Sequence, residues 1–383
     1  MRLALLATVD NPHVIRWIQF LVRQPEISLH VLCDVPVKTR PEDVAIVHPE
    51  MNLLTKIVAF KLFPGPLGNN VFKFLPYRKE LRRIKPDIIH GIEVLGYGAA
   101  AVLSGMDIPT VVTPMGNDIF EWPERSRIAH YLVRLSLKKA DIITTNMPNL
   151  ADFLHQRFHI PAEKVRAFSW GVDTEIFHPG YEDEVRKLRE QLRIPDGAAV
   201  VISNRQMQKY WGIENVVRSA PLILKNSSRP VYFIFLRGSG SLEFEDAMKD
   251  LCTQIGIREN TRFIGEFITP EQMAVYLNCA DVFISLPRSD LLSISVLEGM
   301  ACGCTPILAN LPAYHTRITH GENGFLVPPD AHDVIAEYAV RAMEDPDIRR
   351  QFAARNVEII KEHDSWSHNA HHMLEIYKAL LRA

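Results

Sequence analysis

Short apolar runs alternate with segments of helical periodicity through the first 145 residues of the chain. Leu3–Thr8 is an apolar run, and Asn11 after it can cap a helix that has Pro12 at its first position. The apolar residues of that helix recur at helical spacing up to Val22. Alternation of strands with helices is typical of a parallel, doubly wound sheet. The other runs predicted as strands in this half are 29–33, 87–90, 110–113 and 141–145.

The same alternation restarts near residue 198. Residues 170–184, between the halves, are rich in turn-forming types, and we place a domain boundary there, at about residue 178. The predicted organisation is an N-terminal domain of 1–178, a C-terminal domain of 179–365 and a C-terminal helix of 366–383, after a polar break. In the second half, strands are predicted at 198–203, 231–236, 262–265, 282–286 and 305–309, and helices at 212–225, 242–255 and 270–279.

Composition restricts the class of protein. With 383 residues, 47% of them apolar and 23% charged, the chain suits two globular domains. A formal net charge of −2 gives no general attraction to nucleic acid. Five cysteines without a CxxC pair argue against a zinc site or a disulfide framework and favour a reducing cytoplasm. The apolar run at the N-terminus is too short for a signal peptide, and no apolar run is long enough to span a membrane.

The segment 288–306 carries the most specific chemistry. It places Asp290 in a turn after a predicted strand and Glu298 inside a short helix that ends at Ala301. The start of that helix, at Leu292–Ser293, can bind an anion through unpaired N–H groups and the helix dipole. The two acids then flank the anion and can accept hydrogen bonds from sugar hydroxyls, so a nucleotide sugar fits. The alternative interpretation is an ordinary turn with a capping Asp and a solvated Glu.

This segment resembles the E-x7-E signature of retaining GT-B glycosyltransferases of the family-4 type. Asp290 takes the place of the first Glu, and Leu291-Leu292 replaces the usual small residues. The resemblance implies an α/β fold of two Rossmann-like doubly wound domains facing a central cleft, with a C-terminal helix that often crosses back to the first domain. It also implies that Asp290 orients the donor sugar and that Glu298 binds the ribose hydroxyls.

The loop 204–212 follows the first strand of the second half, where open α/β sheets bind ligands. Arg205 can clamp a phosphate bidentately, and Lys209 can add a point charge. The loop is similar to the family's strand–Arg–Leu–x–x–x–Lys–Gly loop, whose cations neutralise the donor diphosphate. Here Lys209 comes one residue early, and Tyr210-Trp211 precedes Gly212. The alternative is that both cations are simply solvated.

Two further turns are candidates for the donor side. Gly238 and Gly240 permit a tight turn after the strand 231–236 and resemble the family's Gly-x-Gly turn. By the same resemblance, Glu266 and Phe267 lie near the nucleotide base. Simple turn formation explains each of these pairs equally well. The segment 171–179 resembles the family's interdomain N-G-V-D-x-x-x-F-x-P, with Trp170 where Asn is common.

The acceptor-side candidates end strands of the first half. Gly116 and Asp118 match the family's strand–x–His/Trp–Gly–x–Asp loop, while Met115 stands where many relatives have a His and cannot move a proton. His13 follows the first strand and is a further acceptor-side candidate. Asp118 has an alternative role as a helix cap, and His90 is expected to serve in packing and hydrogen bonding.

The stretch 51–85 has eight cations against one acid, a local balance of +7, interleaved with aromatic and aliphatic residues. Such a surface can lie on an anionic bilayer, or it can be an ordinary helix face beside the core. We expect a cytoplasmic protein. It is either free in the cytoplasm or attached peripherally to the inner face of the plasma membrane.

No Asp-x-Asp metal motif ends a predicted strand. Arg205, Lys209 and the helix start at 292–293 can stabilise the leaving diphosphate in place of a metal, so we expect no metal and no cofactor.

The function that the sequence predicts is transfer of a sugar from a nucleotide sugar to a hydroxyl of a glycan or lipid-linked acceptor, with retention of configuration. The alternatives are a non-catalytic paralogue that binds a nucleotide sugar and a nucleotide-sugar epimerase of similar architecture. A dehydrogenase is disfavoured because no G-x-G-x-x-G follows the first strand.

Overall fold

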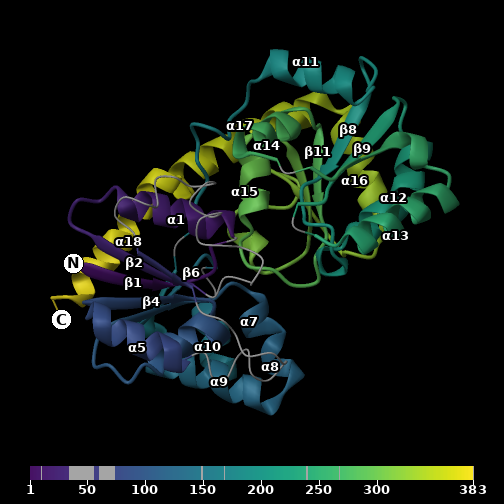
Figure 1. Ribbon diagram of the computed structural model, residues 1–383. Coiled ribbons are helices and arrows are strands. Elements are labelled where there is room, and N and C mark those ends of the chain that lie inside the picture. Colours follow the sequence, from purple (N-terminus) through teal and green to yellow (C-terminus); the bar gives the residue numbers. More distant parts are fainter. Residues whose placement is uncertain are drawn as a thin grey trace. The chain divides into compact units, whose positions relative to one another are not determined.

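The computed structural model describes residues 1–9, 11–33, 56–59, 74–147, 150–167, 169–238, 240–266 and 268–382. The chain divides into two compact units. Unit 1 comprises Met1–Phe168 together with Ala370–Ala383, and unit 2 comprises Ser169–Asn369. Both are α/β units, as the alternating sequence pattern predicts (Figure 1).

Unit 1 is built on a seven-stranded sheet in the order β3-β2-β1-β4-β5-β6-β7, and all its strand pairs are parallel. This order is that of a doubly wound sheet, in which the chain reverses its direction of travel between β1 and β4. The strands are β1 (Arg2–Leu6), β2 (Ser28–Cys33), β3 (Lys56–Ala59), β4 (Ile88–Ile92), β5 (Thr110–Thr113), β6 (Ile142–Thr145) and β7 (Val165–Ala167).

The helices of unit 1 connect these strands. The helix predicted after β1 forms, and the Asn11 side chain caps it by accepting a hydrogen bond from the His13 N–H at 2.9 Å. The helices are α1 (Pro12–Val22), α5 (Phe74–Ile84), the π-helix η1 (Val94–Gly98), α6 (Ala99–Val102), α7 (Asn117–Phe120), α8 (Trp122–Arg125), α9 (Arg127–Lys139), α10 (Leu150–Phe158) and the 3-10 turn η2 (Ala162–Lys164).

Unit 2 has a six-stranded sheet in the order β10-β9-β8-β11-β12-β13, again with every pair parallel. Alternate residues of β8 enter two separate apolar clusters, Val201 in one and Val200 in the other. The sheet is therefore buried on both faces, which explains its continuous apolar runs. The strands are β8 (Ala199–Ser203), β9 (Val231–Leu236), β10 (Thr261–Ile264), β11 (Val282–Ser285), β12 (Thr305–Ala309) and β13 (Phe325–Val327).

Helices cover both faces of this second sheet (Figure 1). One cluster includes residues of α12, α13 and α16, and the other includes residues of α11, α14, α15 and α17. The helices are α11 (Glu182–Gln191), α12 (Ile213–Asn226), α13 (Leu242–Gln254), α14 (Pro270–Asn278), α15 (Ile294–Ala301), α16 (His332–Glu344) and α17 (Pro346–His363), with 3-10 turns η3 (Lys209–Trp211), η4 (Arg258–Asn260) and η5 (Tyr314–Thr316).

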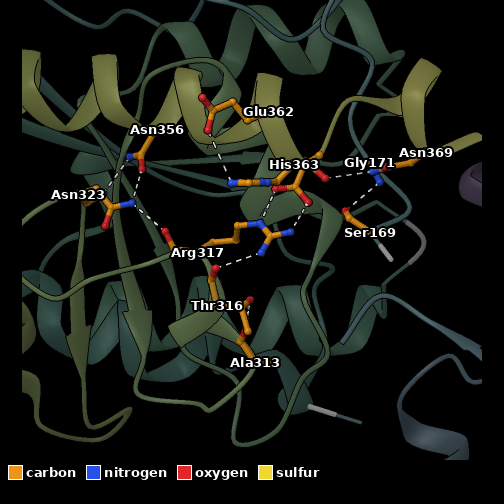
Figure 2. Close-up of polar contacts among 11 residues, drawn as sticks. Ser169, Gly171, Ala313, Thr316, Arg317, Asn323, Asn356, Glu362, His363 and Asn369 are labelled. Atoms are coloured by element: carbon orange, nitrogen blue, oxygen red, sulfur yellow. Dashed lines mark hydrogen bonds and ion pairs between the residues drawn. The ribbon is translucent and has the colours of Figure 1, made fainter. Parts of the chain in front are cut away.

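The segment that precedes the predicted boundary at residue 178 packs inside unit 2. Val172 and Phe177 are buried in its core, and the Val172 N–H donates to the Asp364 carbonyl at 2.7 Å. The Arg317 guanidinium donates to both carboxylate oxygens of the buried Asp364, at 2.6 and 3.2 Å (Figure 2). Because these contacts hold the segment, the division between the units falls after Phe168 and earlier than residue 178.

The C-terminal helix α18 (Trp366–Leu380) starts in unit 2 and belongs to unit 1 from Ala370 onward. The Tyr377 hydroxyl lies 2.6 Å from Nδ1 of His90 in the middle of β4, and both side chains are buried. The Nε2 atom of His90 lies 2.7 Å from the Thr113 hydroxyl. This hydrogen-bonded chain attaches the last helix to the centre of the unit 1 sheet.

Candidate functional site

The loops after β8 and β11 lie at the same edge of the unit 2 sheet. The two strands are neighbours, and the chain continues from β8 to β9 on one side and from β11 to β12 on the other. Ligands of doubly wound sheets bind outside the carboxyl ends of the strands at this kind of reversal. The predicted donor-site residues of 204–212 and 288–298 therefore belong to one region of unit 2.

Arg205 is buried at this edge, with 5% of the residue exposed. Its guanidinium forms an ion pair with Asp290 at 2.9 Å and donates hydrogen bonds to the hydroxyls of Ser293 and Ser295. The ring of Trp211 covers the guanidinium, with its centroid 3.8 Å from Cζ. The Arg205 guanidinium is therefore already bound by protein side chains, whereas the sequence predicts that it is open to clamp a phosphate.

Asp290 lies beside Arg205 and is also largely buried. One carboxylate oxygen accepts from the Tyr314 hydroxyl at 2.8 Å, and the other accepts from the Leu291 N–H at 2.9 Å. Burial raises the pKa of Asp290, while Arg205, Tyr314 and the backbone donor oppose that rise. Tyr314 was absent from the sequence-based site because it is 24 residues away, in η5, and no motif marks it.

The start of α15 presents the predicted anion-binding region. Ser293 is the N-cap residue, but its side chain makes no capping hydrogen bond, and its hydroxyl lies 2.8 Å from that of Ser295. Leu291 and Leu292 are buried, so the two large residues of this turn point into the protein interior. Glu298 is partly buried in the second turn of the helix.

The loop after β8 is attached to the loop after β11. The Tyr210 hydroxyl donates to the Ser289 carbonyl at 2.8 Å. Gly212 has φ +71°, and a Cβ atom there would lie 2.0 Å from the Leu286 carbonyl oxygen. The two residues inserted before this glycine thus have a structural use, because Tyr210 joins the loops and Trp211 covers Arg205. Lys209 is exposed and forms no ion pair with the residues that the structure describes.

Two side-chain polar atoms of the loop after β8 are buried and lack a hydrogen-bond partner among the described residues. They are the Oδ1 atom of Asn204 and the Nε1 atom of Trp211. The amide nitrogen of Asn204 is used, since it donates to the Ser295 carbonyl at 3.2 Å. An unpaired buried polar atom is costly, so one acceptor and one donor remain for a polar ligand.

The other predicted donor-side residues belong to the turn after β9 and to the segment after β10. A Cβ atom at Gly240 would lie 2.5 Å from the Met207 amide nitrogen, so this glycine allows the turn to pack against the loop after β8. Gly238 has φ +55° in the same turn. Glu266 is exposed after β10, and Phe267 lies outside the described residues. Their contact with a nucleotide stays a prediction.

In unit 1, the Asp118 side chain joins two loops. It is buried and accepts hydrogen bonds from the N–H groups of Val94, Met115 and Gly116, at 2.6 to 3.0 Å. Burial raises its pKa to about 6, against the opposing effect of these donors. Gly116 has φ +111°, a backbone conformation that favours glycine. Asp118 thus positions the loops after β4 and β5, and His13 is partly exposed at the start of α1.

Within the described part of the chain, no three His, Cys, Asp or Glu side chains gather as a metal site would require. Among the same residues, none of the helices combines the length and apolar character needed to cross a bilayer.

Two family models match the chain. The one described as Glycosyl transferases group 1 matches residues 184–358, and the one described as Glycosyl transferase 4-like matches residues 2–147. A D-inositol 3-phosphate glycosyltransferase of Catenulispora acidiphila is 26% identical over 63% of the chain and 58% of its own length. An uncharacterised glycosyltransferase of Methanocaldococcus jannaschii is 24% identical over 67% of the chain and 65% of its own length. The matches thus span less than two thirds of these relatives.

Solved structures share the whole fold at low sequence identity. A sucrose-phosphate synthase of Thermosynechococcus elongatus superposes with a TM-score of 0.80 over 100% of this chain and 99% of its own, at 18% identity. The HepE protein of Anabaena, in complex with UDP-glucose, gives 0.80 over 99% of this chain and 100% of its own, at 16% identity. The predicted GT-B architecture is confirmed at the level of the fold.

Proposed function

Since the chain belongs to the group 1, family-4-like glycosyltransferases and has their GT-B fold, we propose that it transfers a sugar from a nucleotide sugar to a hydroxyl acceptor. The observation that carries the proposal is the Arg205–Asp290–Tyr314 cluster at the strand reversal of unit 2, beside the start of α15. The HepE complexes contain UDP and UDP-glucose, and the relative from Catenulispora acidiphila is named for D-inositol 3-phosphate. Both names support this donor and acceptor chemistry.

The donor is proposed to bind along the loops after β8 and β11. Its diphosphate would meet the N–H groups at the start of α15 and the exposed ammonium of Lys209. Glu298 would accept hydrogen bonds from the ribose hydroxyls. The unpaired Asn204 oxygen and Trp211 N–H would be further partners for polar groups of the donor.

In this proposal Arg205 acts mainly by positioning, since its guanidinium already binds Asp290 and two serines. Its charge favours the ionised form of Asp290, against the effect of burial, beside the place of the donor sugar, and its guanidinium holds the serines at the helix start. Lys209 and the helix dipole stabilise the charge that grows on the leaving diphosphate. We propose that the reaction retains configuration and needs no metal. A strict requirement for Mg²⁺ or Mn²⁺ would contradict the last point.

The test begins with thermal shift of the whole chain against UDP-, GDP- and ADP-sugars, since a bound donor stabilises the native state by mass action. The sugar that binds is then incubated with and without acceptors. Transfer or slow hydrolysis supports the enzyme. Binding without either supports the non-catalytic paralogue, and release of an altered free sugar without acceptor supports the epimerase. If no nucleotide sugar shifts the melting temperature, the proposed function is wrong.

Two substitutions examine the assigned roles, the first by calorimetry and the second by steady-state kinetics. Glu298→Ala should weaken nucleotide binding by about 1–3 kcal/mol, the scale of a lost charged hydrogen bond. Glu337→Ala, an exposed acid on α16, is the matched control and should leave binding unchanged. Lys209→Ala should lower turnover more than it raises the donor KM, because the charge it contacts grows in the transition state. Unaltered affinity in Glu298→Ala would remove the ribose assignment.

We also propose that the acceptor is presented at an anionic membrane. The support is the +7 balance of residues 51–85, which is unusual in a chain of net charge −2. Much of this stretch lies outside the described residues. The described helix α5 carries three exposed cations of the stretch, and a fourth exposed cation follows its last residue. They are Lys79, Arg82, Arg83 and Lys85.

A further inference from the structure

Large apolar side chains are exposed together on helices α8 and α9 of unit 1. The described part of the chain exposes six large apolar side chains, and three of them lie within ten residues. Trp122 is 36% exposed at the first residue of α8, and Ile128 and Tyr131 are 56% and 64% exposed near the start of α9. Apolar residues exposed singly are common, but a local group of large ones is typical of a binding surface. The solvent-exposed side of residues 122–139 is called the α8–α9 surface below.

The sequence of α9 places Ile128 and Tyr131 on its solvent side. Ser126 caps the helix by accepting a hydrogen bond from the Ala129 N–H at 3.0 Å. The buried residues of the helix recur at helical spacing and are Ala129, Val133, Ser136 and Leu137. Ile128 and Tyr131 are three residues apart, so they share a face, and that face is opposite to the buried one. The buried stripe is complete without them, and the packing of α9 therefore does not require them to be apolar.

The α8–α9 surface is also positively charged. Residues 121–139 contain five Lys and Arg against two Glu, a local balance of +3. Both glutamates are paired within unit 1, Glu121 with Arg125 at 3.0 Å and Glu124 with Arg157. Three further cations of α9 are exposed and form no ion pair with the residues that the structure describes. They are Arg127, Lys138 and Lys139.

The helices α9 and α5 lie on the same face of the unit 1 sheet. The chain runs from β3 through α5 to β4, from β4 through α6 to β5, and from β5 through α9 to β6. These connections all move in one direction across the sheet, and right-handed crossovers of one direction place their helices on one face. Figure 1 shows α5 and α9 on one side of this sheet and α1 on the other. One flat partner can therefore contact the exposed cations of α5 and the α8–α9 surface at the same time.

The chemistry of the α8–α9 surface is that of a bilayer interface. Trp and Tyr prefer the headgroup region because each combines an apolar ring with a polar group, and Lys and Arg beside them contact lipid phosphates. Protein interfaces are also rich in Trp, Tyr and Arg, but they are depleted of Lys. Two of the three exposed cations of α9 without an acidic partner are lysines. The charge and the apolar group together favour a lipid surface over a protein partner.

We propose that the α8–α9 surface docks on an anionic phospholipid bilayer, with Ile128 and Tyr131 entering the headgroup region and the cations of α9 contacting lipid phosphates. The inference rests on the proposed presentation of the acceptor at a membrane and deepens it, because it names the surface of unit 1 that makes the contact. The cations of α5 supply attraction that salt screens. The apolar side chains supply contact that depends on area removed from water.

The first test measures co-sedimentation with vesicles of phosphatidylcholine, with and without phosphatidylglycerol, at low salt. The wild type should sediment only with the anionic vesicles. The double variant Ile128→Ser/Tyr131→Ser should keep the melting temperature and lower the vesicle partition coefficient about tenfold, since two apolar side chains no longer enter the interface. The double variant Leu222→Ser/Leu242→Ser is the matched control, because both leucines are exposed on unit 2, and its partition coefficient should equal that of the wild type.

The second test locates the contact directly. All five native cysteines are buried, so a polarity-sensitive fluorophore can be attached to a single introduced thiol in Tyr131→Cys. Its emission should increase and shift to shorter wavelength when anionic vesicles are added. The same label in Leu222→Cys, on unit 2, should show no change.

The proposal is overturned if the wild type does not bind anionic vesicles, if the Ile128/Tyr131 double variant binds them equally well, or if the label at residue 131 does not respond. It is also overturned if light scattering shows a dimer of the wild type that the double variant cannot form, because the surface then joins two copies of the chain. None of these measurements uses a nucleotide sugar. Their failure therefore leaves the proposed glycosyl transfer intact, and a failure of donor binding leaves the membrane contact intact.

Discussion

Unit 1 should lose stability in mild acid because of His90. The imidazole is fully buried between the Tyr377 and Thr113 hydroxyls, and burial lowers its pKa from the ordinary 6.5 to about 3. The unfolded chain therefore takes up a proton below pH 6.5 that the folded chain refuses. The stabilising effect is fully present above pH 6.5 and is lost progressively as the pH falls toward 3. Between pH 7 and pH 5 the loss should be about 2 kcal/mol.

Hydrogen exchange measured by mass spectrometry can detect this loss in unit 1 separately from unit 2. Exchange rates of peptides from β4, β5 and the end of α18, corrected for intrinsic rates, should correspond to an opening free energy about 2 kcal/mol lower at pH 5 than at pH 7. The chain has 15 histidines, so the comparison must be with His90→Gln, which keeps a donor and an acceptor but does not titrate. An equal pH dependence in wild type and His90→Gln would refute the reasoning.

Three further outcomes are expected. Gly212→Ala should destabilise unit 2 and weaken donor binding, because the new methyl group meets the Leu286 carbonyl. Gly197 has a similar positive φ but open space around it, so Gly197→Ala should lower the free energy of unfolding by only about 1–2 kcal/mol. All five cysteines are buried, and burial raises the pKa of Cys252 to about 11, so Ellman's reagent should find no reactive thiol before denaturation. Vesicles containing phosphatidylglycerol should co-sediment the protein at low salt, with about 1 kcal/mol from each of Lys79, Arg82, Arg83 and Lys85. Serine at those four positions should abolish co-sedimentation. As a control, serine at Arg186, Lys187, Arg218 and Lys225 on unit 2 should leave co-sedimentation unchanged. A wild type that never sediments would favour an acceptor free in solution.

The alternation of apolar runs determined the fold class because a strand buried on both faces must be apolar throughout. The strands predicted at 110–113, 231–236 and 305–309 form with those bounds. The edge strands β7 and β13 were not predicted, since three residues each are too few to show a pattern. The packing of 170–178 with unit 2 could not be predicted from the sequence either, because it depends on Asp364, which is far away along the chain.

The sequence by itself also indicated where the site is, since loops after neighbouring parallel strands must meet at one edge. Which residues bind one another there was decided by tertiary structure. Tyr314 reaches Asp290 from η5, and Trp211 and two serines occupy Arg205, so the side chain that seemed open to a ligand is engaged by the protein.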